Sequence, residues 1–388
     1  MIKIVEKSDC CGCCACVQKC PKQFIKLKAD NEGFLYPNVD INNCINCGLC
    51  EKVCPIINAA KLNFNSQAVD TLVAYCKDDN IRAESSSGGG FSIIANYILS
   101  HGGIIFGAAF DKDFSVHHIK AENYDELSLL RGSKYVQSRI ENTYKQAEVA
   151  LKNGRLVLFT GTACQIAGLY GYLGKKYDNL ITVDVLCHGV GSPDVWLRHL
   201  DEIKDRYHSE ISEVTFRSKD LGWRRYAVKI NFKNGMTYLQ DRLHDNYSKL
   251  FLQALCLRPS CHKCYFKGMD RPSDITIGDG WGVENHHPNL DDNKGVSIIL
   301  VHNITGKTLL NKILCDLYYE DSDLDSMLSI EANSRSSIKA HPKRKKFFKL
   351  FNKGSRISNL SKLAKPTLLM KINNKISCLK KLYYSYRK

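Results

Sequence analysis

Apolar and polar residues in the central part of the chain follow two alternating patterns. Short apolar runs rich in β-branched residues predict buried strands, and the segments between them have the spacing of helices. The expected strands are residues 72–76, 103–109, 155–159, 181–186 and 296–301. The expected helices are residues 91–99, 142–151, 163–172, 193–207 and 305–318. This alternation favours an α/β domain with a partly parallel sheet.

A second group of apolar runs predicts antiparallel strands. These runs cover residues 214–216, 226–232 and 236–239. Asn234-Gly235 lies between the last two runs and is typical of a tight hairpin turn. The larger domain is therefore expected to contain a mixed sheet.

Residues 1–58 differ from this pattern, because they have many cysteines and no long apolar periods. A unit of this size needs a metal or another crosslink to support its small core. After a polar linker, a larger domain is expected over residues 71–335 and a basic tail over residues 339–388. The predicted fold class is α+β or mixed α/β, with a small module, a larger domain and a helical tail.

The composition is that of an ordinary globular protein, with 388 residues, 44% hydrophobic and 24% charged. The formal charge of +15 comes from 55 Lys and Arg against 40 Asp and Glu. Residues 339–388 contain 16 of the basic residues and no acidic one, so the rest of the chain is nearly neutral. The charge therefore belongs to the tail, and no nucleic-acid partner is expected.

The end of the tail has apolar residues at helical spacing and lysines between them. The apolar positions are Leu368, Leu369, Ile372, Ile376, Leu379, Leu382, Tyr383 and Tyr386. A basic amphipathic helix can lie on an anionic membrane surface, but it more commonly packs on the protein itself or on a partner. We expect a cytoplasmic protein, since the chain shows no signal-like or membrane-spanning segment, with peripheral contact at the inner membrane surface as the alternative.

Ten of the 18 cysteines precede residue 55. In the reducing cytosol, dense cysteine indicates metal binding rather than disulfides. Two runs have the spacing C-x2-C-x2-C-x3-C-P, which is typical of bacterial ferredoxins. The first run is Cys10, Cys13, Cys16 and Cys20, and the second is Cys44, Cys47, Cys50 and Cys54. Residues 1–58 are thus predicted to be a ferredoxin-type domain with two [4Fe–4S] clusters.

In such runs, the first three thiolates bind one cluster and the fourth reaches the other cluster. We therefore assign Cys10, Cys13, Cys16 and Cys54 to one cluster, and Cys44, Cys47, Cys50 and Cys20 to the other. Zinc ribbons also use CxxC knuckles, but two four-cysteine runs that each end in proline favour the ferredoxin interpretation. Cys11 and Cys14 fall outside the spacing and are interpreted as bystander thiols.

Four further cysteines could form a third cluster. Cys164 and Cys187 follow predicted strands, where ligands collect in α/β sheets, and Cys261 and Cys264 form a CxxC pair. A competing pattern, C-x4-C-x2-C from Cys256, resembles the plant-type [2Fe–2S] run, but its fourth ligand would have to be Cys315 or Cys378. Buried apolar cysteines are an equally good interpretation of Cys164 and Cys187.

Two glycine-containing turns lead into expected helices, at residues 85–90 and at Gly161-Thr162. Free N–H groups at the start of a helix suit phosphate groups, but an ordinary helix N-cap explains these turns at least as well. The chain has no GxxxxGK[ST] motif and no strand-positioned GxGxxG, which disfavours a P-loop or a standard dinucleotide-binding fold.

Taken together, seven segments resemble the coenzyme F-420 hydrogenase/dehydrogenase beta subunit family, and also the 7-hydroxymethyl chlorophyll a reductases. They are the doubled cysteine run and residues 84–91 (ESSSGGGF), 131–138 (RGSKYVQS), 159–166 (FTGTACQI), 184–189 (DVLCHG), 258–261 (RPSC) and 274–282 (DITIGDGWG). The resemblance implies a flavin, FAD or FMN, beside a third [4Fe–4S] cluster held by Cys164, Cys187, Cys261 and Cys264.

The flavin-binding residues expected with this resemblance are Ser87, Gly88, Gly89, Gly90, Lys134, Thr160, Gly161, Thr162, Gly278 and Asp279. Lys134 is expected to pair with a flavin or substrate phosphate. His188 and Asp279 are the expected catalytic residues, acting by hydrogen bonds to the isoalloxazine or by proton transfer. Each of these side chains could also be a surface or capping residue.

The function expected from these observations is that of an iron–sulfur flavoprotein oxidoreductase. It would pass electrons between a hydride carrier or organic substrate, of the deazaflavin coenzyme F-420 type or another, and a redox partner protein. Fold and cofactor transfer between relatives more safely than substrate does. The alternative is a non-catalytic electron-transfer subunit or adaptor that docks a partner enzyme.

Overall fold

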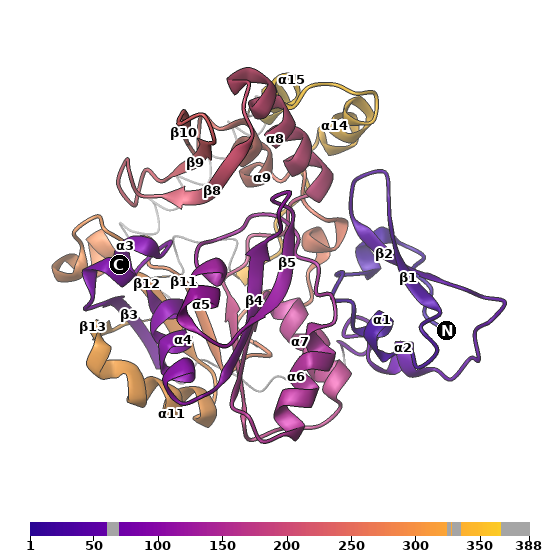
Figure 1. Cartoon of the computed structure of the whole chain (residues 1–388), viewed down its shortest axis with the longest axis horizontal. Coiled ribbons are helices and arrows are strands. Elements are labelled where there is room, and N and C mark those ends of the chain that lie inside the picture. Colours follow the sequence, from indigo (N-terminus) through magenta and orange to yellow (C-terminus); the bar gives the residue numbers. More distant parts are fainter. Residues whose placement is uncertain (60–69, 324–326, 328–334, 366–388) are drawn as a thin grey trace, which may run out of the picture.

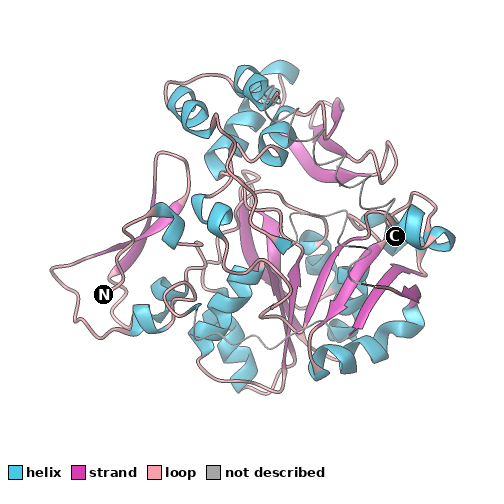
Figure 2. Ribbon diagram, turned by 180° about the vertical axis from the view of Figure 1, so that it is seen from behind, coloured by secondary structure: helices cyan, strands magenta, loops and turns pink. Residues whose placement is uncertain are grey.

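The computed structural model describes residues 1–59, 70–323, 327 and 335–365 (Figure 1). A small N-terminal module lies beside a large α/β body, and a smaller layer of strands and helices covers one end of that body (Figures 1 and 2). The fold class predicted from the sequence is confirmed. The expected amphipathic segment after residue 365 lies outside the described residues.

The body is built on an eight-stranded mixed sheet with the order β13-β3-β12-β11-β7-β6-β4-β5. Its strands are β3 (Asp70–Cys76), β4 (Ile104–Phe110), β5 (Val116–Ala121), β6 (Val157–Gly161), β7 (Leu180–Val185), β11 (Ile275–Asp279), β12 (Ser297–Val301) and β13 (Leu317–Asp321). Strands β4, β6, β7 and β11 are parallel neighbours, and the remaining pairs are antiparallel. The expected mixed sheet is therefore confirmed.

Helices cover both faces of this sheet, and the side chains of its strands alternate between two cores. On one face lie α4 (Gly90–Ser100), α5 (Tyr124–Leu130) and α11 (Ile304–Ile313), and on the other α6 (Thr143–Lys152) and α7 (Ala163–Leu173). In β4, for example, Ile105 enters the first core, whereas Ile104 and Phe106 enter the second. Short strands with buried residues on both sides are what a sheet covered on both faces requires.

Five strands point their carboxyl ends toward the same edge of the sheet. Since β12 is antiparallel to both β3 and β11, strand β3 runs in the direction of β11, β7, β6 and β4. One glycine turn follows β3, the other lies at the end of β6, and Cys164 and Cys187 follow β6 and β7. This edge is therefore where an α/β sheet places a ligand site.

The covering layer contains a separate three-stranded antiparallel sheet of β8 (Ile211–Ser218), β9 (Ala227–Phe232) and β10 (Thr237–Asp241). The hairpin predicted at Asn234-Gly235 joins β9 to β10, and Gly235 has the positive φ of 82° that this turn requires. Its helices are α8 (Pro193–Tyr207), α9 (Asn246–Leu252), α14 (Arg344–Phe351) and α15 (Ile357–Leu360). Helix α8 has the bounds expected from the sequence.

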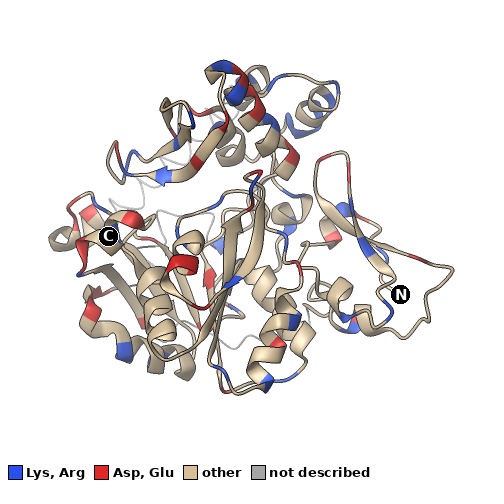
Figure 3. Ribbon diagram, viewed as in Figure 1, with Lys and Arg blue, Asp and Glu red and all other residues tan. Residues whose placement is uncertain are grey.

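The described part of the basic C-terminal segment packs on this layer. Phe347 and Ile357 are fully buried in the core shared with α8 and α9. Arg344 forms a bidentate ion pair with Glu32 of the N-terminal module, at 2.6 and 2.9 Å. Figure 3 shows the basic positions of α14 next to the mixed charges of α8. None of the helices in the described ranges is both long and apolar enough to span a membrane.

One expected helix is too long. Residues 305–318 were expected to be helical, but α11 ends at Ile313 and a short 3-10 helix, η5 (Leu314–Asp316), leads into β13. Tyr318 pairs with Tyr75 across the edge of the sheet. Pairing with the free edge of β3 outweighs the helical spacing of the apolar residues, because the strand gains both backbone and side-chain partners.

The N-terminal module contains an antiparallel hairpin of β1 (Ile25–Ala29) and β2 (Leu35–Val39), with the short helices η1 (Lys7–Asp9), α1 (Ala15–Lys19) and α2 (Leu49–Lys52). It docks against α7. A Cβ atom at Gly168 would lie 2.7 Å from Cys13 Cβ, and one at Gly171 would lie 2.4 Å from Val53 O. These two glycines therefore let the module approach the helix backbone.

Between β10 and β12, the remaining short helices are η3 (Pro259–Lys263), α10 (Val283–His286) and η4 (Pro288–Leu290), and α3 (Asp79–Glu84) follows β3.

We predict that Gly168→Ala destabilises the docked module. Overpacking costs about 1–3 kcal/mol, which exceeds the roughly 1 kcal/mol that alanine gains over glycine in a helix. The free energy of unfolding, measured with denaturant, should fall by on the order of 1 kcal/mol. Gly90→Ala in α4 is the control, because its Cβ would meet no atom closer than 3.6 Å. A Gly168→Ala protein as stable as the wild type would contradict this docking.

Candidate functional site

The two cysteine runs of the N-terminal module fold in the same way. Gly12 and Asn46 have φ values of 75° and 51°, and Cys14 and Gly48 have φ values of 61° and 72°. Cys14 and Gly48 are also the N-caps of α1 and α2. These left-handed residues turn the backbone around the cysteines of each run, so Cys14 occupies a turn position equivalent to a glycine.

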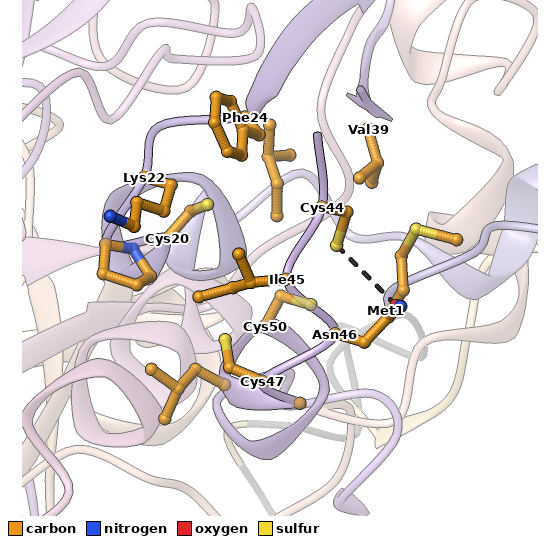
Figure 4. A pocket seen from close by; sticks show the side chains of 14 residues that line it. Met1, Cys20, Lys22, Phe24, Val39, Cys44, Ile45, Asn46, Cys47 and Cys50 are labelled. Atoms are coloured by element: carbon orange, nitrogen blue, oxygen red, sulfur yellow. Dashed lines mark hydrogen bonds between the residues drawn. The ribbon is translucent and has the colours of Figure 1, made fainter. Parts of the chain in front are cut away.

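One hollow in this module is lined by the set Cys20, Cys44, Cys47 and Cys50. Figure 4 shows Cys20 at the end of α1 facing the other three cysteines across the hollow. The remaining lining is mainly apolar and includes Phe24 and Val39. The structure therefore brings the fourth cysteine of the first run to the first three of the second run.

A second hollow is lined by Cys10, Cys13, Cys16 and Cys54. Its lining also includes Cys11 and Cys14 and several apolar side chains. Burial raises the pKa of the Cys14 thiol to about 12 and also raises the pKa of Cys16. Such buried thiols keep their protons at neutral pH unless a metal displaces them.

Both hollows fit a [4Fe–4S] cluster better than a single ion. Each has four cysteine thiols and an otherwise apolar wall, which is the donor set of such clusters. In the parts of the chain that the structure describes, no three His, Cys, Asp or Glu side chains are arranged around one point as a single metal ion requires. The thiols instead surround a hollow, and the described cysteines are all free.

The third set of cysteines gathers at the carboxyl edge of the sheet. Cys164 lies in the first turn of α7, Cys187 follows β7, Cys261 lies in η3 and Cys264 ends η3. Burial raises the pKa of the Cys187 thiol to about 12, and the charges of Cys164 and Cys264 add to the increase. The pKa of Cys261 is raised by burial and by the other three cysteines. The four thiols are therefore electrostatic neighbours.

The competing [2Fe–2S] pattern draws on cysteines in other surroundings. Cys256 is fully buried in the core that contains Trp196 and Tyr247. Cys315 is exposed in η5, near the edge strand β13. Cys378 lies outside the described residues.

Cys11 connects the third set to the N-terminal module. Its thiol interacts with those of Cys13 and Cys164; the interaction with Cys13 and burial raise the pKa of Cys11, whereas the interaction with Cys164 lowers it. Cys11 was interpreted as a bystander from its spacing alone. The structure places it between two cysteine sets, which only the docking of the module on α7 could reveal.

The glycine turn at residues 85–90 is anchored at the carboxyl end of β3. Ser87 Oγ donates to Val296 O at 2.5 Å, and Gly88 N donates to Ser297 Oγ at 3.0 Å. Gly89, with φ of 93°, is the N-cap of α4, which begins at Gly90. The backbone of this turn therefore has little freedom and keeps its position without a ligand.

The second turn is a helix cap. Thr162 and Gln165 form a capping box at the start of α7, and Thr160 Oγ1 donates to Phe106 O at 3.0 Å. Gly161 ends β6 beside these residues.

Lys134 donates to the carbonyls of Leu130, Arg131 and Gly132 at the end of α5, and burial lowers its pKa to about 7. Gly278, in β11, lies close to Leu186, because a Cβ atom there would be 2.6 Å from Leu186 Cδ1.

Asp279 is held by a residue that the sequence analysis missed. Arg217 of β8 donates to both Asp279 oxygens, at 2.8 and 3.0 Å, and also to Ser86 O at 3.3 Å. The guanidinium lies over the ring of Tyr226 at 3.9 Å. An arginine among apolar neighbours in a short strand was the available signal in the sequence, but its partner on β11 could not be identified without the fold.

A second missed cation is Lys219, which donates to Arg82 O at 2.7 Å and Ser87 O at 2.8 Å. Burial lowers its pKa to about 7, with a further decrease from the charges of Arg82 and Arg217. Two cations, Arg217 and Lys219, thus reach the turn at residues 85–88. His188 lies apart from this group: its Nε2 faces Phe251 O at 3.3 Å, and its ring packs on Phe251.

Comparisons with known proteins identify both parts of the chain. Residues 9–57 match the 4Fe-4S dicluster domain, and residues 154–326 match the C terminus of the coenzyme F420 hydrogenase/dehydrogenase beta subunit. The larger domain is therefore similar to the C-terminal part of the coenzyme F420 hydrogenase/dehydrogenase beta subunits, which agrees with the resemblance found in the sequence. The N-terminal part of the chain is an iron–sulfur dicluster domain.

Solved structures include a similar chain in the F420-reducing [NiFe] hydrogenase complex from Methanosarcina barkeri, with 17% sequence identity and a TM-score of 0.46. The similarity covers 77% of this chain and 92% of that chain. A search of curated proteins finds no match. The matched residues 154–326 of this chain contain the third cysteine set, Arg217 and Asp279.

We predict that Cys20→Ser and Cys54→Ser each remove iron from a different cluster of this protein. If Cys20 shares a cluster with Cys47, the double variant Cys20→Ser/Cys47→Ser should lose no more iron than either single variant. Cys20→Ser/Cys16→Ser should lose the iron of both clusters, because its two serines belong to different sets. Iron and acid-labile sulfide analysis measures this, with the exposed Cys315→Ser as the control. Equal losses in the two double variants would contradict the assignment.

We also predict an acid-dependent loss of stability from His118, which contacts Ser138 Oγ at 2.6 Å and Thr160 O at 3.0 Å. Burial lowers its pKa from 6.5 to about 4, so the unfolded chain binds a proton there first as the pH falls. The free energy of unfolding should therefore decrease between pH 6.5 and pH 4, by up to about 3 kcal/mol from this residue.

The measurement is denaturant unfolding at several pH values. His118→Gln should weaken the acid slope, whereas the exposed His286→Gln should leave it unchanged. A slope in His118→Gln as steep as that of the wild type would contradict the prediction.

Proposed function

We propose that this protein is an iron–sulfur flavoprotein oxidoreductase, in which cysteine ligands for three [4Fe–4S] clusters lead from a flavin site at the sheet edge to the outer end of the N-terminal module. The observation that carries the proposal is the arrangement of the cysteines in three neighbouring sets, linked by the contacts of Cys11 with Cys13 and Cys164.

Each set would hold one cluster through its four thiolates. The innermost set would be Cys164, Cys187, Cys261 and Cys264, followed by Cys10, Cys13, Cys16 and Cys54, and then by Cys20, Cys44, Cys47 and Cys50. When bound, a flavin supplies the conversion of a hydride into single electrons, and [4Fe–4S] clusters carry electrons one at a time.

The carboxyl edge of the sheet supports a site for a phosphate-bearing cofactor. Lys219 and Arg217 both reach the turn at residues 85–88, and the lowered pKa of Lys219 means that an anion there would restore its full charge. The start of α4, capped by Gly89 without a side chain, presents backbone N–H groups beside these cations. A flavin phosphate meets both requirements.

Aromatic side chains next to this turn suit a planar ring. Trp281 stacks on Trp223 at 4.7 Å between ring centroids, and Tyr226 and Tyr135 flank Arg217. Within this group, Arg217 would orient Asp279 through its two hydrogen bonds. Asp279 would then accept a hydrogen bond or a proton from the flavin ring. His188 would lie apart from Asp279, against Phe251.

The outer cysteine set supports electron exchange with a protein partner. Cys47 is exposed, and Ile41 and Ile45 in the preceding loop are 68% and 56% exposed. Exposed apolar side chains beside a cluster are suited to a transient redox interface. A hydride carrier or organic substrate would act at the opposite end, beside the flavin.

The second candidate is an electron-transfer subunit that has clusters and no flavin. The capping-box role of Thr162 and the contacts of Lys134 with carbonyl groups favour it, because both residues already have partners within the chain. Flavin content distinguishes the two functions.

We predict that the anaerobically purified protein contains flavin together with iron and acid-labile sulfide. Arg217→Gln should lower the ratio of flavin to iron at least tenfold, since it removes a buried cation near the phosphate site and frees Asp279. Lys263→Gln, which changes an exposed cation of η3, is the control and should keep both contents.

A panel of deazaflavin and nicotinamide reductants, followed by stopped-flow absorbance, then tests the donor. Clusters without flavin in the wild type would favour the relay subunit. A flavin that none of these donors reduces would exclude the version of the proposal in which the protein oxidises a soluble carrier.

A further inference from the structure

Arg258 connects two of the cysteine sets. Its backbone N donates to Val190 O, and its backbone O accepts from Cys261 N, each at 3.0 Å. Its side chain crosses into the N-terminal module, where Nε donates to Cys10 O at 2.8 Å and Nη2 lies 3.5 Å from Cys10 Sγ. One residue therefore contacts a cysteine of the innermost set and a cysteine of the middle set.

The guanidinium of Arg258 is fully buried, with an exposed fraction of 0%. Its other contacts are neutral: Gln137 Oε1 at 2.8 Å, Leu35 O at 3.0 Å and the ring of Tyr36 at 4.3 Å. Across the described residues, no ion pair joins it to a carboxylate. A buried cation is costly unless an anion compensates it, and the anions available here are the cysteine thiolates.

Other buried arginines show that this protein usually supplies a carboxylate. Arg82 pairs with Asp292 at 2.6 Å, and Arg217 pairs with Asp279 at 2.8 Å. The absence of a side chain at Gly12 leaves room for the Arg258 guanidinium. A Cβ atom at Gly12 would lie 2.2 Å from Gln137 Nε2 and 3.1 Å from the guanidinium carbon. The glycine between Cys10 and Cys13 thus lets the cation reach the cysteine loop.

We propose that Arg258 is a positioning residue that serves as the counter-charge of the clusters held by the middle and innermost cysteine sets, and so raises their reduction potentials. One-electron reduction adds one negative charge to a cluster. A buried cation nearby stabilises the reduced form, because its field is weakly screened in an apolar environment. This inference rests on the proposed function, since it requires that both sets hold clusters.

The test is a potentiometric titration of the anaerobically purified full chain, followed by electron paramagnetic resonance. Arg258→Gln should shift the reduction equilibrium of at least one cluster tenfold or more toward the oxidised form, which is about 59 mV for one electron. Arg258→Lys should retain most of the wild-type potential, because it keeps the charge. Lys28→Gln is the control, since it removes an exposed charge from β1 of the N-terminal module, outside the cysteine runs, and should leave the potentials unchanged.

A second variant covers the case in which Arg258→Gln fails to fold or to assemble clusters. Gln137→Glu keeps the arginine and places a carboxylate on its Nη1, so that it should lower the same potential. Unchanged potentials in a cluster-loaded Arg258→Gln protein, or in Gln137→Glu, would overturn the inference and leave the proposed function intact. A wild-type protein without iron and acid-labile sulfide would overturn the proposed function itself.

Discussion

The shared direction of five strands is the constraint on which the candidate site depends. Strands β3, β4, β6, β7 and β11 end at one edge of the sheet, so segments far apart in the sequence meet there. Cys164 and Cys187 follow β6 and β7, and Asp279 is the last residue of β11. If one of these strands ran in the opposite direction, the residues that follow it would lie at the opposite edge of the sheet, and the candidate site would lack them.

The second constraint is the close contact between the N-terminal module and α7. Side chains on that helix face would hold the two units apart, and Gly168 and Gly171 remove this obstacle. The contact brings Cys11 and Cys13 next to the first turn of α7, and it brings Arg258 into the cysteine loop. Electron transfer between separate units requires short distances, so the same two glycines serve both packing and the proposed function.

The sequence was sufficient for features that depend on local pattern. Helix α8 begins at a proline after the Ser192 cap and has a single apolar face, so its bounds of Pro193–Tyr207 could be predicted. The two cysteine runs and the Asn234-Gly235 turn are local motifs of the same kind. The family resemblance, carried by short segments, agrees with the family match of residues 154–326.

Features that depend on pairing between distant segments could not be predicted. The sequence of β13 has the spacing of a helix end, and its pairing with the edge of β3 can be seen only in the fold. The role of Arg217 likewise depends on its ion pair with Asp279, which lies on another strand. Arg258 is the same kind of case, because a sequence shows an arginine near a CxxC pair but not the buried loop that its side chain enters.

Burial differs between the outer and the middle cysteine sets, and this difference gives a physical reason for a cation beside the middle set. Cys47 of the outer set is exposed, so water can stabilise added negative charge there. Cys13 and Cys16 are buried and lie deeper, where a reduced cluster would lack that solvation. Without compensation, the cluster of the middle set would be harder to reduce than the outer one, and electrons entering at the sheet edge would meet an energetic barrier there. A buried guanidinium beside the middle set would offset this loss of solvation, which is the role proposed for Arg258.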